Sequence, residues 1–93
     1  MRAQIWNFSE WVQETDPKRL YMLFSSMLYQ AGFNVIKFVE HHFNPVGYTC
    51  LFLLGESHLA IHTFPEEEKT YIELSSCNKE YYDNFIDLMH GGR

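Results

Sequence analysis

Five short segments of this chain have the residue pattern of β-strands, and four of them lie between two segments with helical spacing. The helical segments are residues 17–31, preceded by the N-cap candidate Asp16, and residues 79–90. The strand-like segments are residues 3–8, 33–42, 48–54, 57–63 and 70–76. Consecutive strands between helices are typical of an α+β fold. We therefore expect a mostly antiparallel sheet with two helices packed on one face.

The uncovered face of such a sheet is expected to need a cover. Aromatic residues make up 17% of the chain, and residues 48–54 are apolar enough for burial on both faces. Large exposed apolar surfaces are uncommon in soluble monomers, and they often mark contacts between copies. We expect a second copy of the chain to bury this face or an edge of the sheet.

Length and charge limit the range of functions. The 93 residues predict a single domain, residues 1–93. Seven basic and twelve acidic residues give a net charge of −5, which disfavours nucleic acid or an anionic membrane surface as the main partner. We find neither an apolar run that could span a bilayer nor a secretory signal. Cys50 and Cys77 are therefore expected to be free thiols in a cytoplasmic protein.

Residues 55–66 concentrate the side chains that can do chemistry: a serine, two histidines and two carboxylates. A serine hydrolase needs its base within about 3 Å of the hydroxyl. Ser57 and His62 lie on opposite faces of one strand, and five residues of strand span roughly 16 Å. A metal site is also disfavoured, because His58 and His62 are too far apart along a strand to share an ion. One extended chain therefore cannot assemble either site.

The same residues form a longer pattern. They are Glu56-Ser57-His58-Leu59-Ala60-Ile61-His62-Thr63-Phe64-Pro65-Glu66, and Cys77 follows twenty residues after the serine. Upstream lies Phe43-Asn44-Pro45-Val46-Gly47-Tyr48-Thr49. Over residues 16–78 the chain resembles the prokaryotic-type pyruvoyl-dependent S-adenosylmethionine decarboxylase proenzymes. Their hallmark is Glu-Ser-His-[Leu/Ile]-x-Ile-His-Thr-Trp-Pro-Glu, with Phe-x-Pro-x-Gly-x-Ser before it.

The resemblance implies a chain that makes its own cofactor. In that family the serine hydroxyl attacks the preceding carbonyl, the amide becomes an ester, and elimination cuts the chain. Cleavage would fall between Glu56 and Ser57 and leave a covalently bound pyruvoyl group derived from Ser57, with no metal. Its ketone would form a Schiff base with an amino acid and accept charge as CO2 leaves. The implied activity is decarboxylation of S-adenosylmethionine for spermidine biosynthesis.

The resemblance also assigns roles to individual residues. His62 matches the histidine that handles protons during self-processing, and Thr49 occupies the helper position that is usually serine. Cys77 matches the cysteine that returns a proton to the substrate after CO2 leaves. The implied substrate-binding residues are Phe43, Phe64 and Glu66.

Short members of this family are dimers with composite active sites. Because His62 cannot reach Ser57 within its own strand, a homodimer would supply the two from different subunits. Ser57 and Cys77 would come from one subunit. The partner would contribute Thr49, His62, Phe43 and Glu66.

The chain departs from the family pattern in several places. Residues 3–8 lack the usual Gly-x-His start, acidic residue and cysteine, and Phe64 replaces a tryptophan. These changes leave the self-processing residues in place but keep ornithine and arginine open as substrates. From another class, an unprocessed binding or regulatory homologue is the alternative. No role is assigned to Cys50, His41, His42 or His90.

Overall fold

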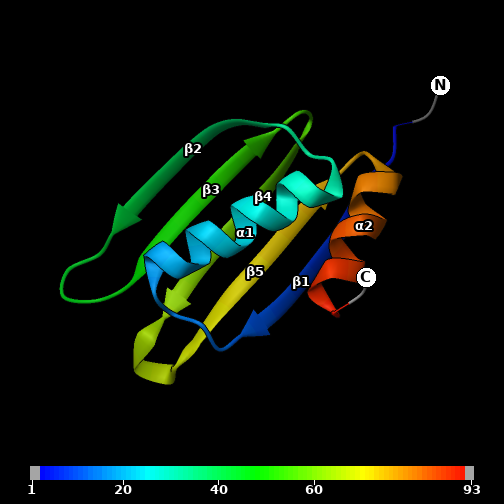
Figure 1. The fold of residues 1–93 in the computed structure, drawn as a ribbon. Helices are drawn as coiled ribbons and strands as arrows, with labels where there is room; N and C mark the ends of the chain where they lie inside the picture. The colour runs from blue at the N-terminus through cyan, green and yellow to red at the C-terminus, as the bar shows by residue number, and fades with distance from the viewer. Residues whose placement is uncertain (1–2, 92–93) are drawn as a thin grey trace.

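The computed structural model describes residues 3–91, which form one five-stranded sheet with two helices on the same face (Figure 1). The elements are β1 (Trp6–Val12), α1 (Pro17–Ala31), β2 (Val35–His42), β3 (Tyr48–Leu54), β4 (Ser57–Phe64), the 3-10 helix η1 (Pro65–Glu67), β5 (Lys69–Ser76) and α2 (Lys79–Met89). All neighbours in the order β1-β5-β4-β3-β2 pair antiparallel. The expected α+β class is confirmed. Residues 1, 2, 92 and 93 of the predicted domain lie outside the described residues.

Local signals set the ends of α1. The Asp16 side chain accepts a hydrogen bond from the Arg19 backbone N–H at 2.9 Å, which caps the first turn. Gly32 ends the helix in the left-handed region with a φ of 113°. A Cβ at Gly32 would lie 2.7 Å from the Tyr81 ring, so the glycine also allows α2 to pack closely against the end of α1. The two helices are thereby fixed to each other above the sheet.

The core fills the space between the helices and the sheet. Phe24 and Leu28 of α1, Phe85 of α2 and Phe52 and Ile61 of the sheet are at most 1% exposed. Alternate residues of β3 and β4 contribute to this core, as the period of a strand requires. The interior between helices and sheet is therefore packed with apolar side chains.

The other face of the sheet, which we call the open face, carries exposed apolar side chains. Trp11, Val39, Leu51 and Leu53 are between 41% and 55% exposed. The expectation that residues 48–54 are buried on both faces is therefore wrong for a single chain, because only their helix-facing side chains are covered. The alternation expected for residues 57–63 is confirmed.

The first strand differs from its expected position. It occupies residues 6–12 and not 3–8, because pairing with β5 determines where it begins and ends. Trp6 lies opposite Ser76, and Val12 lies opposite Thr70. The N-terminal residues of a strand without strong local signals are placed by such tertiary pairing.

Neither helix within residues 3–91 is long and apolar enough to cross a bilayer.

Candidate active site

A two-residue turn joins β3 to β4 at one end of the sheet. Leu54 and Ser57 are paired across the hairpin, so Gly55 and Glu56 form the link between them. Glu56 has a φ of 56°, in the left-handed region that glycine favours. Ser57 is the first residue of β4 and is only 6% exposed. The peptide bond between Glu56 and Ser57 therefore joins a sharp turn to a buried strand.

The Ser57 hydroxyl is held by groups at the end of β5. It donates to Ser76 Oγ at 3.1 Å and accepts from the Cys77 backbone N–H at 3.4 Å. The Ser76 hydroxyl in turn donates to the Asn78 carbonyl at 3.3 Å. Ser76 was not among the predicted site residues. The alternation of residues 70–76 places it on the same face as Ser57, but only the β4–β5 register brings the two together.

Cys77 also lies beside this turn. Its thiol donates to Glu56 Oε1 at 3.4 Å. Glu56, Cys77, Asn78 and Tyr81 help to line a pocket of about 300 Å³ at this end of the molecule. The structure thus brings together Glu56, Ser57 and Cys77, which are separated by up to twenty-one residues in sequence. We call this group the cleavage end, after the cleavage that the resemblance predicts there.

Thr49 and His62 form a second group on the open face. They lie directly opposite each other in β3 and β4, and Thr49 Oγ1 is 3.0 Å from His62 Nδ1. The His62 ring also stacks on Tyr71, with centroids 6.4 Å apart and an interplanar angle of 23°. Ser57 faces the helices, whereas His62 faces the opposite side of the sheet. His62 therefore lies beside Thr49, and the geometry excludes a Ser57–His62 pair within one chain.

The predicted substrate-binding residues lie near the far end of β4. Phe43 belongs to the loop before β3 and is 50% exposed, while Phe64 ends β4 and packs on Trp11 with a centroid distance of 5.8 Å. Glu66 lies in η1 and is exposed. Figure 1 shows η1 and the β2–β3 loop at the end of the sheet opposite the β3–β4 turn. Within one chain, most of the length of β4 therefore separates these residues from the cleavage end.

The two cysteines differ in environment. Cys50 is 1% exposed, and burial raises the pKa of its thiol to about 11. The Glu40 charge raises this pKa further, whereas a hydrogen bond with Tyr48 lowers it. Cys77 is partly exposed. Cys50, whose thiol stays protonated and buried, is therefore suited to packing in the core and not to reaction with a substrate.

This difference predicts selective alkylation. At pH 8, iodoacetamide is expected to modify Cys77 in the folded protein and to leave Cys50 unmodified. A pKa of about 11 leaves only about one Cys50 thiol in a thousand ionised at that pH, and burial blocks access. Peptide mass spectrometry would locate the label, and denatured protein labelled at both cysteines serves as the control. Equal labelling rates in the folded protein would contradict this assignment.

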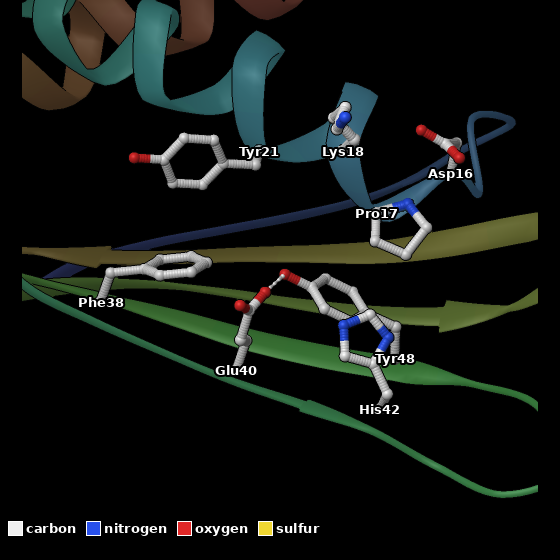
Figure 2. A pocket seen from close by; sticks show the side chains of 8 residues that line it. All are labelled: Asp16, Pro17, Lys18, Tyr21, Phe38, Glu40, His42 and Tyr48. Atoms are coloured by element: carbon white, nitrogen blue, oxygen red, sulfur yellow. Dashed lines mark hydrogen bonds between the residues drawn. The ribbon is translucent and has the colours of Figure 1, made fainter.

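A cavity of about 640 Å³ lies between α1 and β2 (Figure 2). Its walls include Tyr21, Phe38, His42 and Tyr48. The Tyr48 hydroxyl donates to the Glu40 carboxylate, as the dashed line in Figure 2 marks. Burial, and then this hydrogen bond, raise the pKa of Tyr48. None of the predicted catalytic residues lines this cavity.

His41, His42 and His90, which have no predicted role, have structural contacts. The His41 ring packs edge-on against Phe43 with centroids 4.6 Å apart, and His90 Nε2 lies 3.3 Å from Glu10 Oε1. Within residues 3–91, no group of three or more His, Cys, Asp or Glu side chains is arranged to hold a metal ion.

Comparison with known proteins identifies relatives along nearly the whole chain. The family model described as S-adenosylmethionine decarboxylase matches residues 4–90. An S-adenosylmethionine decarboxylase proenzyme from Prochlorococcus marinus (strain MIT 9313) is 39% identical over 51 residues, which are 55% of this chain and 41% of the relative. The proenzyme from Syntrophomonas wolfei is 34% identical over 62 residues, 67% of this chain and 49% of the relative. The matches thus span at most about half the length of these curated relatives.

The fold has a counterpart among solved structures. The crystal structure of the adenosylmethionine decarboxylase from Aquifex aeolicus VF5 matches with a TM-score of 0.76, and the match covers 98% of this chain and 81% of that one. At 18% identity this likeness supports the fold alone. The evidence for the family is the sequence match over residues 4–90 together with the Glu56–Glu66 motif. The chain belongs to the S-adenosylmethionine decarboxylase family.

Proposed function

We propose that the chain is the proenzyme of a pyruvoyl-dependent S-adenosylmethionine decarboxylase that cuts itself between Glu56 and Ser57. The observation that carries this proposal is the arrangement at the cleavage end. The buried Ser57 hydroxyl is held by Ser76 and the Cys77 N–H, beside a peptide bond in a left-handed turn. The Cys77 thiol lies against the same turn. A structural strand serine would not need these three features together.

The proposed self-cleavage needs only residues of the protein itself and water. Ser57 Oγ bonds to the carbonyl carbon of Glu56, the C–N bond breaks, and the nitrogen takes up the hydroxyl proton. Removal of the Ser57 Cα proton then breaks the bond between Ser57 Cβ and Oγ. The backbone α-carboxylate of Glu56 leaves, and the chain is cut. Tautomerisation and hydrolysis release ammonia and leave a pyruvoyl group at residue 57. The Thr49–His62 pair of a second subunit, with Thr49 Oγ1 and His62 Nδ1 3.0 Å apart, is the proposed proton carrier for these steps.

The residues around Ser57 fit the group that this reaction would leave. A pyruvoyl ketone supplies an electron sink for decarboxylation of an α-amino acid. Ser76 Oγ and the Cys77 N–H are in place to hydrogen-bond to an oxygen at residue 57. Cys77 Sγ carries a proton beside the same residue, so it can deliver that proton to a substrate α-carbon. A free thiol in this role favours a reducing compartment such as the cytoplasm.

A homodimer would complete the active site. In one chain the cleavage end lies at the start of β4, and Phe64 and Glu66 lie at or just beyond its other end. Two copies that pack antiparallel through their open faces would place the end of one β4 near the start of the other. Leu51 and Leu53 are more than 40% exposed on that face, and such packing would bury them. This arrangement supports composite sites formed by both subunits.

The residues near the far end of β4 favour S-adenosylmethionine as the substrate. Phe43 and Phe64 present exposed aromatic rings, which suit an adenine ring and a sulfonium cation. The Glu66 carboxylate can accept hydrogen bonds from ribose hydroxyls. Ornithine and arginine have neither an adenine ring nor a ribose, so these residues would have less to bind.

The mass of the purified protein under denaturing conditions tests the proposal. We expect two fragments, residues 1–56 and 57–93, and the second should have a blocked N-terminus that reacts with ketone reagents. The processed protein should then release CO2 from carboxyl-labelled S-adenosylmethionine, with labelled ornithine and arginine as competing substrates. A single intact species after long incubation would contradict the proposal and favour an unprocessed binding or regulatory protein.

Replacing Cys77 separates cleavage from decarboxylation. The Cys77→Ala chain should still be cut, because its backbone N–H to Ser57 remains, but CO2 release should fall about 100-fold with loss of the acid. Fragment masses and CO2 release should be measured on the same preparation. Cys50→Ala is the matched control, since Cys50 is buried in the core. Full CO2 release by the Cys77→Ala protein would refute its role as the proton donor.

A further inference from the structure

The backbone at the proposed cleavage point has an unusual conformation. Among the described non-glycine residues, Glu56 and Glu68 have a positive φ, at 56° and 55°. Side chains rarely adopt this region, because Cβ approaches the backbone too closely. Glu68 follows η1 and lies away from the cleavage end. Glu56 is the residue whose carbonyl Ser57 would attack.

The sequence of the turn makes this conformation more notable. Gly55 has no left-handed φ, and a Cβ added there would meet nothing within 4 Å. The turn therefore has a glycine where an ordinary residue would fit and a glutamate where glycine is favoured. The Glu56 carboxylate accepts a hydrogen bond from the Cys77 thiol, and Leu54 and Ser57 are paired on either side. The surrounding structure thus holds Glu56 in a conformation that costs free energy.

We propose that the left-handed backbone of Glu56 is a strain device that promotes self-cleavage. This inference rests on the proposed function, because it concerns the same peptide bond. In the amide, the Glu56 carbonyl carbon is connected to the Ser57 Cα through one atom, the nitrogen. In the ester it is connected through Oγ and Cβ, so the link is one atom longer and the turn can relax. After cleavage, Glu56 is a free chain end and its φ is no longer constrained.

Strain of this kind acts on the population of the ester. An unstrained peptide strongly favours the amide over the ester, because the amide is stabilised by resonance. Strain that is present in the amide and released in the ester shifts this equilibrium towards the ester. Elimination consumes the ester, so the rate of cleavage rises in proportion to the ester fraction. Glycine at position 56 would remove the strain without removing any of the proposed proton-carrying groups.

Three variants separate strain from side-chain chemistry. Glu56→Gly relieves the backbone and removes the side chain, whereas Glu56→Ala removes most of the side chain and keeps the strain. Glu68→Gly is the matched control, because it relieves a nearly equal φ at a turn remote from Ser57. Each chain is synthesised in a cell-free system at one concentration, and its cleavage is followed by mass spectrometry. Hydroxylamine, which cuts esters but leaves amides intact at neutral pH, traps the ester fraction.

We expect Glu56→Gly to be cut about fivefold more slowly than the unaltered chain, which corresponds to about 1 kcal/mol at 1.36 kcal/mol per tenfold. Its hydroxylamine-trapped fraction should fall by a similar factor. Glu56→Ala should be cut several-fold faster than Glu56→Gly, and Glu68→Gly should match the unaltered chain. In a Ser57→Ala background, which cannot be cut, Glu56→Gly and Glu68→Gly should each raise the melting temperature.

The outcomes distinguish this inference from the proposed function. If the unaltered chain is cut and Glu56→Gly is cut just as fast, the strain device is refuted and the proposed function stands. The strain device is also refuted if Glu56→Gly fails to raise the melting temperature of the Ser57→Ala chain, since no strain would then be present. If Glu56→Ala is as slow as Glu56→Gly, the side chain and not the backbone promotes cleavage. An unaltered chain that stays whole would overturn both proposals.

Discussion

A chain with Ser57 replaced by alanine is expected to remain a single 93-residue species under conditions in which the unaltered chain is cut completely. Alanine has no oxygen to attack the Glu56 carbonyl, so neither the ester nor the elimination can form. Hydrolysis of an unassisted peptide bond is too slow to replace this route. Mass measurement under denaturing conditions after long incubation checks the prediction.

Ser75→Ala is the matched control for that experiment. Ser75 lies in β5 opposite His58, one residue before the Ser76 that contacts the Ser57 hydroxyl. Its side chain alternates to the open face, so cleavage should proceed normally in this variant. A Ser57→Ala chain that is still cut at the same bond would refute the proposed chemistry.

Coexpression of two inactive variants is expected to restore cleavage. Ser57→Ala lacks the nucleophile, and His62→Ala lacks the proposed proton carrier, so each alone should stay whole. In a mixed dimer, the Ser57→Ala subunit would supply His62 to the intact Ser57 of the other subunit. The His62→Ala chain should then be cut, while the Ser57→Ala chain remains whole. Different affinity tags on the two chains make the fragments distinguishable by mass.

The dimer interface provides the control for this complementation. Leu53 is 46% exposed on the open face, and Leu53→Glu would place a charge within the proposed interface. Added to both chains, this change should abolish the restored cleavage and shift the protein to a monomer in sedimentation. Complementation that fails although mixed dimers form would contradict composite sites. Cleavage of the His62→Ala chain on its own would remove His62 from the mechanism.

Much of the fold could be predicted because its signals are local. Asp16 and Gly32 mark the ends of α1, and the observed helix occupies the residues between them. The alternation of residues 57–63 predicts which side chains face the core, and the burial of Ile61 agrees with it. The position of β1 could not be predicted in this way. Its boundaries depend on pairing with β5, which lies far along the chain.

For the candidate site, too, some features follow from the sequence and others need the tertiary structure. The adjacency of Ser57 and Glu56 is covalent, and strand periodicity alone separates Ser57 from His62. The approach of Cys77 and Ser76 to Ser57 required the register between β4 and β5.

By itself, the sequence determined the order of the two α-helices and five strands, the family and the bond proposed for cleavage, because these depend on neighbouring residues and on spacing along one chain. Only the tertiary structure decided that Glu56 adopts a left-handed φ and that Ser76 holds the Ser57 hydroxyl. It also showed that one face of the sheet carries exposed leucines. The physical reason is that backbone strain, hydrogen bonding and exposure depend on contacts between segments that are distant in sequence.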